Sequence, residues 1–182
     1  MDKIVIEGLF KQILKEFGLN TESANLKDTP KRITKMYCDE LLSGLKEPEF
    51  NLTVFPNEEK YNELVIIKDI DFSSLCEHHF VPFLGKVHVG YLPNKHYVGL
   101  SKIARTVEYF SKRPQVQERL TQQVADFLFS KLKPYNVIVV VEAEHLCMSV
   151  RGVKKRATTI TSAIKGKMKD GTREEFLRLI RG

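Results

Sequence analysis

The chain has 182 residues, of which 42% are hydrophobic and 29% are charged. This composition supplies enough apolar material for a packed core and excludes an intrinsically disordered chain. The formal net charge of +6 favours anionic partners such as phosphates, nucleic acids or membrane surfaces, but it does not choose among them.

The first 60 residues are expected to form an N-terminal helical segment. Thr29 and Pro30 mark the start of a second helix, with Thr29 as N-cap and Pro30 at the first helical position, and Gly44 ends it. Residues 46–62 contain two prolines and several polar residues, which indicates a connector. The apolar residues of the first helix recur at helical spacing: Ile6, Leu9, Phe10, Ile13, Leu14 and Phe17.

Residues 61–182 are expected to form the catalytic domain, an α+β body. Strands are predicted at 64–70, 86–91 and 136–150, the second with Val87, Val89 and Tyr91 on one face. A helical tract at 101–132 is interrupted at Arg113 and Pro114, because proline disfavours helix at the residue before it. A capping box at 172–175 opens a last helix. The order predicts an antiparallel sheet with helices packed on one face.

Cysteine usage indicates a reducing compartment. Three cysteines, Cys38, Cys76 and Cys147, are an odd and sparse set that argues against a secreted disulfide framework. The first residues lack the apolar stretch of a signal peptide, and the apolar run at 137–141 is far too short to span a bilayer. We therefore expect a soluble cytoplasmic protein with no membrane partner.

Two clusters of thiols and imidazoles suggest a metal site. Cys76 and His79 form a Cys-x-x-His turn, and Cys147 follows far downstream. Because both residues lie on the strand predicted at 136–150, we expect His145 and Cys147 to share a face, about 6.6–6.8 Å apart. Two thiolates and one imidazole are three zinc ligands, which leaves the fourth position for water, as in catalytic zinc sites.

Other interpretations of these clusters stay open at this stage. His78 or His145 is conceivable as a fourth protein ligand, which would make the zinc structural. A disulfide between Cys76 and Cys147 is a further alternative, although the compartment argues against it. The donor set also accepts iron.

Anion-binding residues are predicted near a helix start and after the last long strand. Ser101 is a candidate N-cap, and Lys102 and Arg105 share a helix face near its N-terminus. Arg151 lies four residues after Cys147. On this feature alone, two solvated charges near a helix start are the favoured explanation. Nucleic acid is disfavoured for the stretch at 151–156, because no aromatic residue for base stacking lies near it.

Taken together, the motifs resemble the GTP cyclohydrolase type I family. The resemblance runs from about residue 20 to the end of the chain. The matching stretches are Asp28-Thr-Pro-Lys-Arg32, Ser74-Leu-Cys-Glu-His-His-Phe80, Gly99-Leu-Ser-Lys-Ile-Ala-Arg105, Arg113-Pro-Gln-Val-Gln-Glu-Arg-Leu-Thr121, Glu144-His-Leu-Cys-Met148 with Arg151-Gly152, and Thr172-Arg-Glu-Glu-Phe-Leu177.

The resemblance implies a role for each matching site residue. By it, Cys76, His79 and Cys147 are the ligands of one Zn²⁺ per subunit, and His78, His145 and Ser101 are the proton-transfer residues. Gln117 and Glu118 are the pair that recognises guanine. A carboxylate can accept hydrogen bonds from the N1–H and the exocyclic amino group of guanine. The triphosphate and ribose contacts implied are Ser101, Lys102, Arg105 and Arg151, with Arg32 reaching the substrate of a neighbouring subunit.

The resemblance also implies the reaction and the assembly. GTP and water give 7,8-dihydroneopterin triphosphate and formate, the first step of tetrahydrofolate and tetrahydropterin synthesis. The implied fold is the tunnelling fold, in which subunit sheets join into a barrel and two stacked pentamers form a homodecamer. The competing interpretation is a zinc-stabilised nucleotide- or RNA-binding module without chemistry. Two other tunnelling-fold enzymes fit less well, because nitrile reductases rely on a nucleophilic cysteine and pterin synthases on a three-histidine zinc site.

Overall fold

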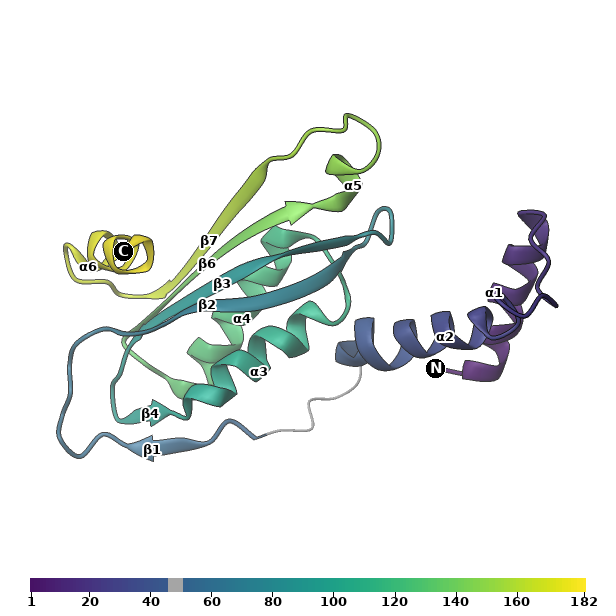
Figure 1. The fold of residues 1–182 in the computed structure, drawn as a ribbon. Helices are drawn as coiled ribbons and strands as arrows, with labels where there is room; N and C mark the ends of the chain where they lie inside the picture. Colours follow the sequence, from purple (N-terminus) through teal and green to yellow (C-terminus); the bar gives the residue numbers. More distant parts are fainter. Residues whose placement is uncertain (46–50) are drawn as a thin grey trace.

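The computed structural model describes residues 1–45 and 51–182. The chain forms an N-terminal pair of helices followed by a twisted sheet with helices packed on it (Figure 1). In chain order the elements are α1 (Lys3–Glu16), α2 (Thr29–Lys35), a π-helix (Met36–Leu41), a 3-10 turn (Ser43–Leu45), β1 (Val54–Pro56), β2 (Val65–Cys76), β3 (Pro82–Leu92), β4 (His96–Val98), α3 (Leu100–Ser111), β5 (Pro114–Gln115), α4 (Gln117–Leu132), β6 (Asn136–His145), α5 (Leu146–Ser149), β7 (Thr158–Gly166) and α6 (Thr172–Arg181).

The main sheet has the strand order β5-β2-β3-β6-β7 and is antiparallel except for the short parallel pairing of β5 with β2. The hairpin of β2 and β3 turns between Leu75 and Pro82, which are paired. At its other end Val65 pairs with Tyr91. The predicted α+β class and antiparallel sheet are therefore confirmed.

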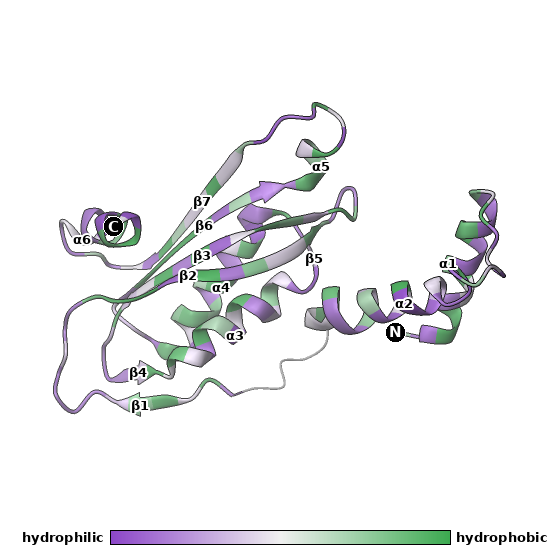
Figure 2. Ribbon diagram, in the orientation of Figure 1, coloured by the Kyte–Doolittle hydropathy of each residue, from purple (hydrophilic) through white to green (hydrophobic). Residues whose placement is uncertain are grey.

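The core lies between one face of the sheet and helices α3 and α4. Alternate residues of each strand enter it, as the period of two requires. Val87, Val89 and Tyr91 are buried there, which confirms the face predicted for 86–91. Figure 2 shows hydrophobic and hydrophilic residues alternating along the helices, as expected for amphipathic helices that cover a sheet.

Helix α6 packs on the opposite face of the sheet, an addition to the predicted layers. Its Phe176 is fully buried with Ile138 and Val140, the residues of β6 that point away from α3 and α4. A Cβ on Gly90 would lie 2.7 Å from the Phe176 ring, so the missing side chain at this position makes room for the aromatic ring. The predicted capping box is not formed, because Gly171 is the N-cap and Thr172 is already helical.

The N-terminal helices form as predicted but differ in detail. Asp28 rather than Thr29 is the N-cap of α2, and the helix continues as a π-helix before Gly44. Gly44 approaches the backbone of the body, where its N–H donates to the Lys112 carbonyl at 2.8 Å. Arg113 donates in return to the Gly44 carbonyl at 2.6 Å. This close approach explains a glycine here, because a Cβ would lie 2.1 Å from the Tyr109 carbonyl oxygen.

The connector predicted at 46–62 contains a strand, and its residues 46–50 lie outside the described part. Strand β1 pairs with β4, with Val54 opposite Val98. Residues 54–56 therefore attach to the body, although they were placed in the N-terminal segment 1–60. No helix in the described residues is long and apolar enough to cross a bilayer.

Candidate active site

The three predicted metal ligands come together in space. The Sγ atoms of Cys76 and Cys147 and a ring nitrogen of His79 all lie within 4.8 Å of one another. Cys76 is buried, Cys147 is half-buried and His79 is exposed. The site therefore has a closed side toward the sheet and an open side.

Strand register is the reason that distant cysteines meet. Cys76 ends β2, and the turn that follows folds back so that the Cys76 carbonyl accepts from Phe80 N–H at 2.8 Å. On the neighbouring strand Phe83 pairs with His145, so the end of β6 lies beside this turn. Cys147 then follows in the short helix α5. The prediction that His145 and Cys147 share a strand face was wrong, because β6 ends at His145.

The donor set fits a tetrahedral zinc ion. Zn–S bonds of about 2.3 Å and Zn–N bonds of about 2.0–2.1 Å place ligand atoms about 3.5 Å apart. Cys76 Sγ and His79 Nδ1 are 4.0 Å apart, so a small closure brings them to bonding positions. Burial and the neighbouring Cys76 thiol raise the pKa of Cys147. Two thiols so close together are stable as thiolates when a cation lies between them.

The two predicted catalytic histidines lie beside this triad in different surroundings. His78 is exposed, and its Nδ1 lies 3.8 Å from Cys76 Sγ. His145 is half-buried, and its ring stacks on Phe83 with 4.7 Å between centroids and an interplanar angle of 4°. Burial lowers the pKa of His145 below its ordinary value, while the charge of Glu118 opposes this shift.

The side chain of Gln117 contacts His145 and the sheet. Its Oε1 lies 2.8 Å from His145 Nε2, and its amide nitrogen donates to the carbonyls of Val141 and Thr159, both at 3.0 Å. The same amide lies 3.1 Å from Thr161 Oγ1. The residue is 1% exposed. In the single chain its polar atoms therefore contact the protein interior, and its guanine-reading role stays a prediction.

Glu118 is the next residue of α4, and its side chain is exposed. It lies in the first turn, where the helix dipole stabilises a carboxylate. Since its neighbour Gln117 contacts His145, Glu118 is held on the metal side of the sheet. The structure thus brings Cys76, His78, His79, Glu118, His145 and Cys147 to one end of the molecule.

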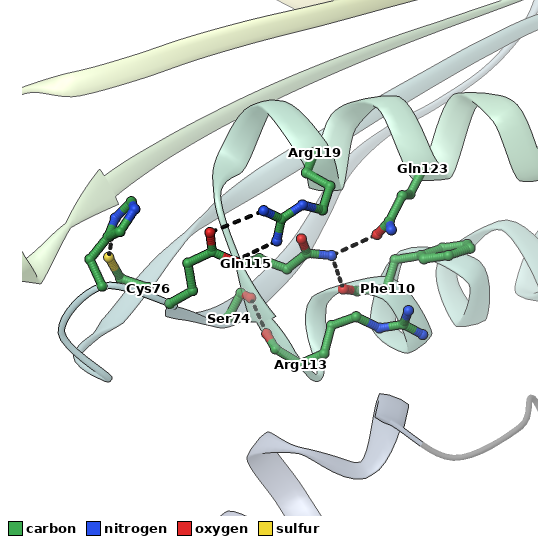
Figure 3. A network of polar contacts seen from close by, with 9 residues as sticks. Ser74, Cys76, Phe110, Arg113, Gln115, Arg119 and Gln123 are labelled. Carbon is green, nitrogen blue, oxygen red and sulfur yellow. Dashed lines mark hydrogen bonds and ion pairs between the residues drawn. The ribbon is translucent and has the colours of Figure 1, made fainter.

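A residue that the sequence did not single out joins this region. The Arg119 guanidinium binds both carboxylate oxygens of Glu77, the second with 3.0 Å between Nη2 and Oε1 (Figure 3). Glu77 is the residue between Cys76 and His78. The guanidinium lowers the pKa of Glu77. The partners are 42 residues apart, so no sequence spacing could have revealed the pair.

The first residues of α3, among them Ser101 and Lys102, lie at the other end of the body, whereas Arg105 lines a pocket with Ser73 and Leu84. Helix α3 begins beside β4, away from the β2–β3 turn (Figure 1). The 11 residues of β3 between these ends span roughly 30 Å. Within one chain, therefore, Ser101 and Lys102 lie away from the predicted metal ligands. Gly99 rather than Ser101 is the N-cap of α3, which corrects that detail.

The other two residues predicted to contact the substrate, Arg32 and Arg151, are exposed arginines. Arg151 lies shortly after α5 and is therefore near the metal ligand Cys147 in the chain. Arg32 lies in α2, where its guanidinium donates to the Asn25 carbonyl and to Thr29 Oγ1. It belongs to the N-terminal helices and not to the sheet that carries the metal ligands.

The fold and these side chains define an α+β protein with a candidate metal-centred active site. The sequence pattern of the family described as GTP cyclohydrolase I matches residues 6–181. The chain belongs to this family of enzymes.

Relatives named GTP cyclohydrolase 1 match the whole of this chain. The protein of Pelotomaculum thermopropionicum is 50% identical over 186 residues, which cover 98% of its length. That of Listeria welshimeri is 51% identical over 97% of its length, and that of Aquifex aeolicus is 48% identical over 98%. A solved structure, the archaeosine synthase QueF-Like in the apo form, is similar over 55% of this chain and 92% of that chain. Its TM-score is 0.45 at 17% identity, too low to bear on function.

Proposed function

We propose that the protein is a zinc-dependent hydrolase that converts GTP and water to 7,8-dihydroneopterin triphosphate and formate. The observation that carries this proposal is the meeting of Cys76, His79 and Cys147 within 4.8 Å, beside the half-buried His145, in a chain of the GTP cyclohydrolase I family. Three ligands leave a coordination position for a reactant, as in catalytic zinc sites. All described cysteines are free, in keeping with the cytoplasmic location that we propose.

Zinc is the metal that the donor set favours, because soft thiolates and an imidazole in tetrahedral reach suit it. Bound zinc supplies Lewis-acid chemistry that activates water at neutral pH. His78 and His145 are not needed as ligands, since three donors already converge without them. Their place beside the triad fits proton transfer instead.

His145 is held in one tautomer by its neighbours. The Gln117 amide nitrogen donates to two backbone carbonyls, so its oxygen is the atom that faces His145 Nε2. An amide oxygen only accepts, and His145 Nε2 therefore carries a proton. Nδ1 is the nitrogen left to exchange a proton with the substrate. Stacking on Phe83 fixes the plane of the ring.

Glu118 is the group that we propose for guanine recognition. Its carboxylate is exposed in the first turn of α4, next to the residue that holds His145. A carboxylate accepts two parallel hydrogen bonds from the N1–H and amino group of guanine. This contact would hold the base beside both the metal ligands and the proton donor.

The triphosphate requires a second copy of the chain. Lys102 lies in the first turn of α3, away from the β2–β3 turn, whereas Arg105 lines a pocket with Ser73 and Leu84 of the hairpin, so we propose that a neighbouring subunit presents its own Lys102 to this metal centre. Large apolar side chains exposed on the single chain support assembly, among them Ile4 at 87%, Phe17 at 74% and Ile160 at 62%. We propose a homodecamer of two stacked pentamers, with Arg32 and Arg151 also at the substrate.

The test is incubation of the purified protein with GTP, following formate release and pterin fluorescence with and without a zinc chelator. We expect both products to form together and to disappear on chelation. His145→Ala is expected to keep zinc and GTP binding but to lose turnover. Binding of GTP without formate would refute the proposal and indicate the non-catalytic binding module.

A further inference from the structure

The turn that carries two of the metal ligands is joined to helix α4 by one ion pair. Glu77, inside the Cys76–His79 turn, accepts two hydrogen bonds from the Arg119 guanidinium. Arg119 follows Glu118 in the first turns of α4. The pair therefore links the metal-binding turn to the segment that bears the proposed guanine-binding carboxylate.

The contribution of this pair to overall stability is small. The side chain of Arg119 is 45% exposed and that of Glu77 30%, and exposed ion pairs contribute little to stability. A bidentate arginine–carboxylate contact nevertheless fixes both distance and angle between its partners. Its main effect is therefore geometric, on the placement of the turn relative to α4.

Other hydrogen bonds hold the start of the turn, whereas the side chain of Glu77 contacts α4. The Glu77 N–H donates to the Gln115 carbonyl at 3.1 Å, and Ser74 Oγ donates to the Arg113 carbonyl at 3.2 Å. The Gln115 amide in turn donates to the Phe110 carbonyl and to Gln123 Oε1 (Figure 3). These bonds tie the end of β2 to the connection between α3 and α4.

We propose that Glu77 and Arg119 are positioning residues, which hold the Cys76–His79 turn at a fixed place relative to Glu118. The inference rests on the proposed function, because alignment matters only if the metal centre and the bound base must meet. Misplacement by about 1 Å costs on the order of 100-fold in rate, so a small loss of order at this turn is measurable. Neither residue is assigned a contact with substrate.

The experiment is a double-mutant cycle with Glu77→Gln, Arg119→Gln and the double variant in the full-length assembled protein. Asp126→Asn is the matched control, because Asp126 lies on the same helix and pairs with Lys165 at 2.7 Å with similar exposure, 54% and 31%. Two quantities are measured: kcat and KM for GTP at saturating zinc, and the zinc Kd of the metal-free protein by chelator competition. Thermal unfolding checks that every variant is folded.

Each single variant is expected to lower kcat by about 10–100-fold and to weaken zinc binding by about tenfold. The KM for GTP should stay within about threefold of the wild-type value. The double variant should be no worse than the more affected single variant, because both remove the same contact. Arg119→Lys should recover part of the loss. The control should stay within about twofold of wild type.

Other outcomes contradict the proposal. Variants indistinguishable from Asp126→Asn would show that the pair has no positioning role. Single effects that multiply in the double variant, or a rise in KM confined to Arg119→Gln, would mean that Arg119 binds the substrate directly. A wild-type protein that releases no formate would refute the proposed function instead, while the zinc Kd would still report on the pair.

Discussion

Replacing Gln117 by methionine tests how His145 is held. The variant keeps the volume and burial of the side chain but removes its amide. The amide contacts four neighbours and makes three hydrogen bonds at a time, since its two hydrogens are shared among the carbonyls of Val141 and Thr159 and Thr161 Oγ1, and its oxygen accepts from His145. His145 then loses the acceptor that selects its protonated nitrogen.

The magnitude follows from these bonds. Three hydrogen bonds at about 1 kcal/mol each make a loss of about 3 kcal/mol. For a chain of this length about 1 kcal/mol corresponds to 2–4 °C in Tm, so we expect Tm to fall by about 6–12 °C. Catalysis should fall further, by about 100-fold in kcat, because the His145 ring is free to rotate and to change tautomer.

The assay combines thermal unfolding at fixed protein concentration with ¹⁵N NMR of histidine-labelled protein, in which His145→Ala identifies the signal of His145. Wild type should show the proton on Nε2, and Gln117→Met a mixture of tautomers. Gln117→Glu is the companion variant, because it keeps an acceptor for His145 but turns a carboxylate toward two carbonyls. It should lower Tm without changing the tautomer. A proton on Nδ1 in wild-type protein would refute the reasoning.

Three further predictions concern the metal, the base and pH. Cys147→Ser should remove bound zinc and formate release together, measured by metal analysis and the formate assay; retained metal with full activity would contradict the ligand assignment. Glu118→Gln should weaken GTP far more than inorganic triphosphate in a binding titration, whereas equal effects would refute guanine recognition. Burial lowers the pKa of His88, whose Nδ1 accepts from Asp69 N–H at 3.2 Å. As pH falls, the unfolded chain therefore protonates His88 at a higher pH than the folded chain does. The stability that neutral His88 contributes is present above pH 6.5 and is lost as pH falls through the folded pKa. His88→Gln should flatten the dependence of Tm on pH between 7.5 and 5.5; an unchanged slope would contradict it.

Periodicity predicted the parts of the fold in which packing follows local pattern. The alternation of Val87, Val89 and Tyr91 was confirmed because one face of β3 lies on the core. The break at Arg113 and Pro114 was confirmed because proline ends a helix locally, and the structure adds the short strand β5 there. The meeting of Cys76, His79 and Cys147 was predicted because thiols and imidazoles are chemically distinctive metal ligands.

Features that depend on tertiary contacts were missed. Strand β6 ends at His145 with no glycine or proline to mark the end, so Cys147 was placed on a strand. The sequence did contain one indication that Gln117 is buried. It lies three and four residues before Leu120 and Thr121, on the buried face of α4. A polar residue on such a face is expected to bind buried partners rather than solvent.

The distance between the metal centre and the α3 residues shapes how the proposed activity depends on assembly. One chain contains all three proposed metal ligands, so we expect zinc binding to need only the register of β2, β3 and β6. The proposed phosphate contacts Ser101 and Lys102 of the same chain lie at the start of α3, away from the β2–β3 turn, and β3 itself spans roughly 30 Å, so we expect turnover to need a neighbour. Metal content should therefore persist when assembly is weakened, whereas formate release should fall steeply, because only the second depends on the site between subunits.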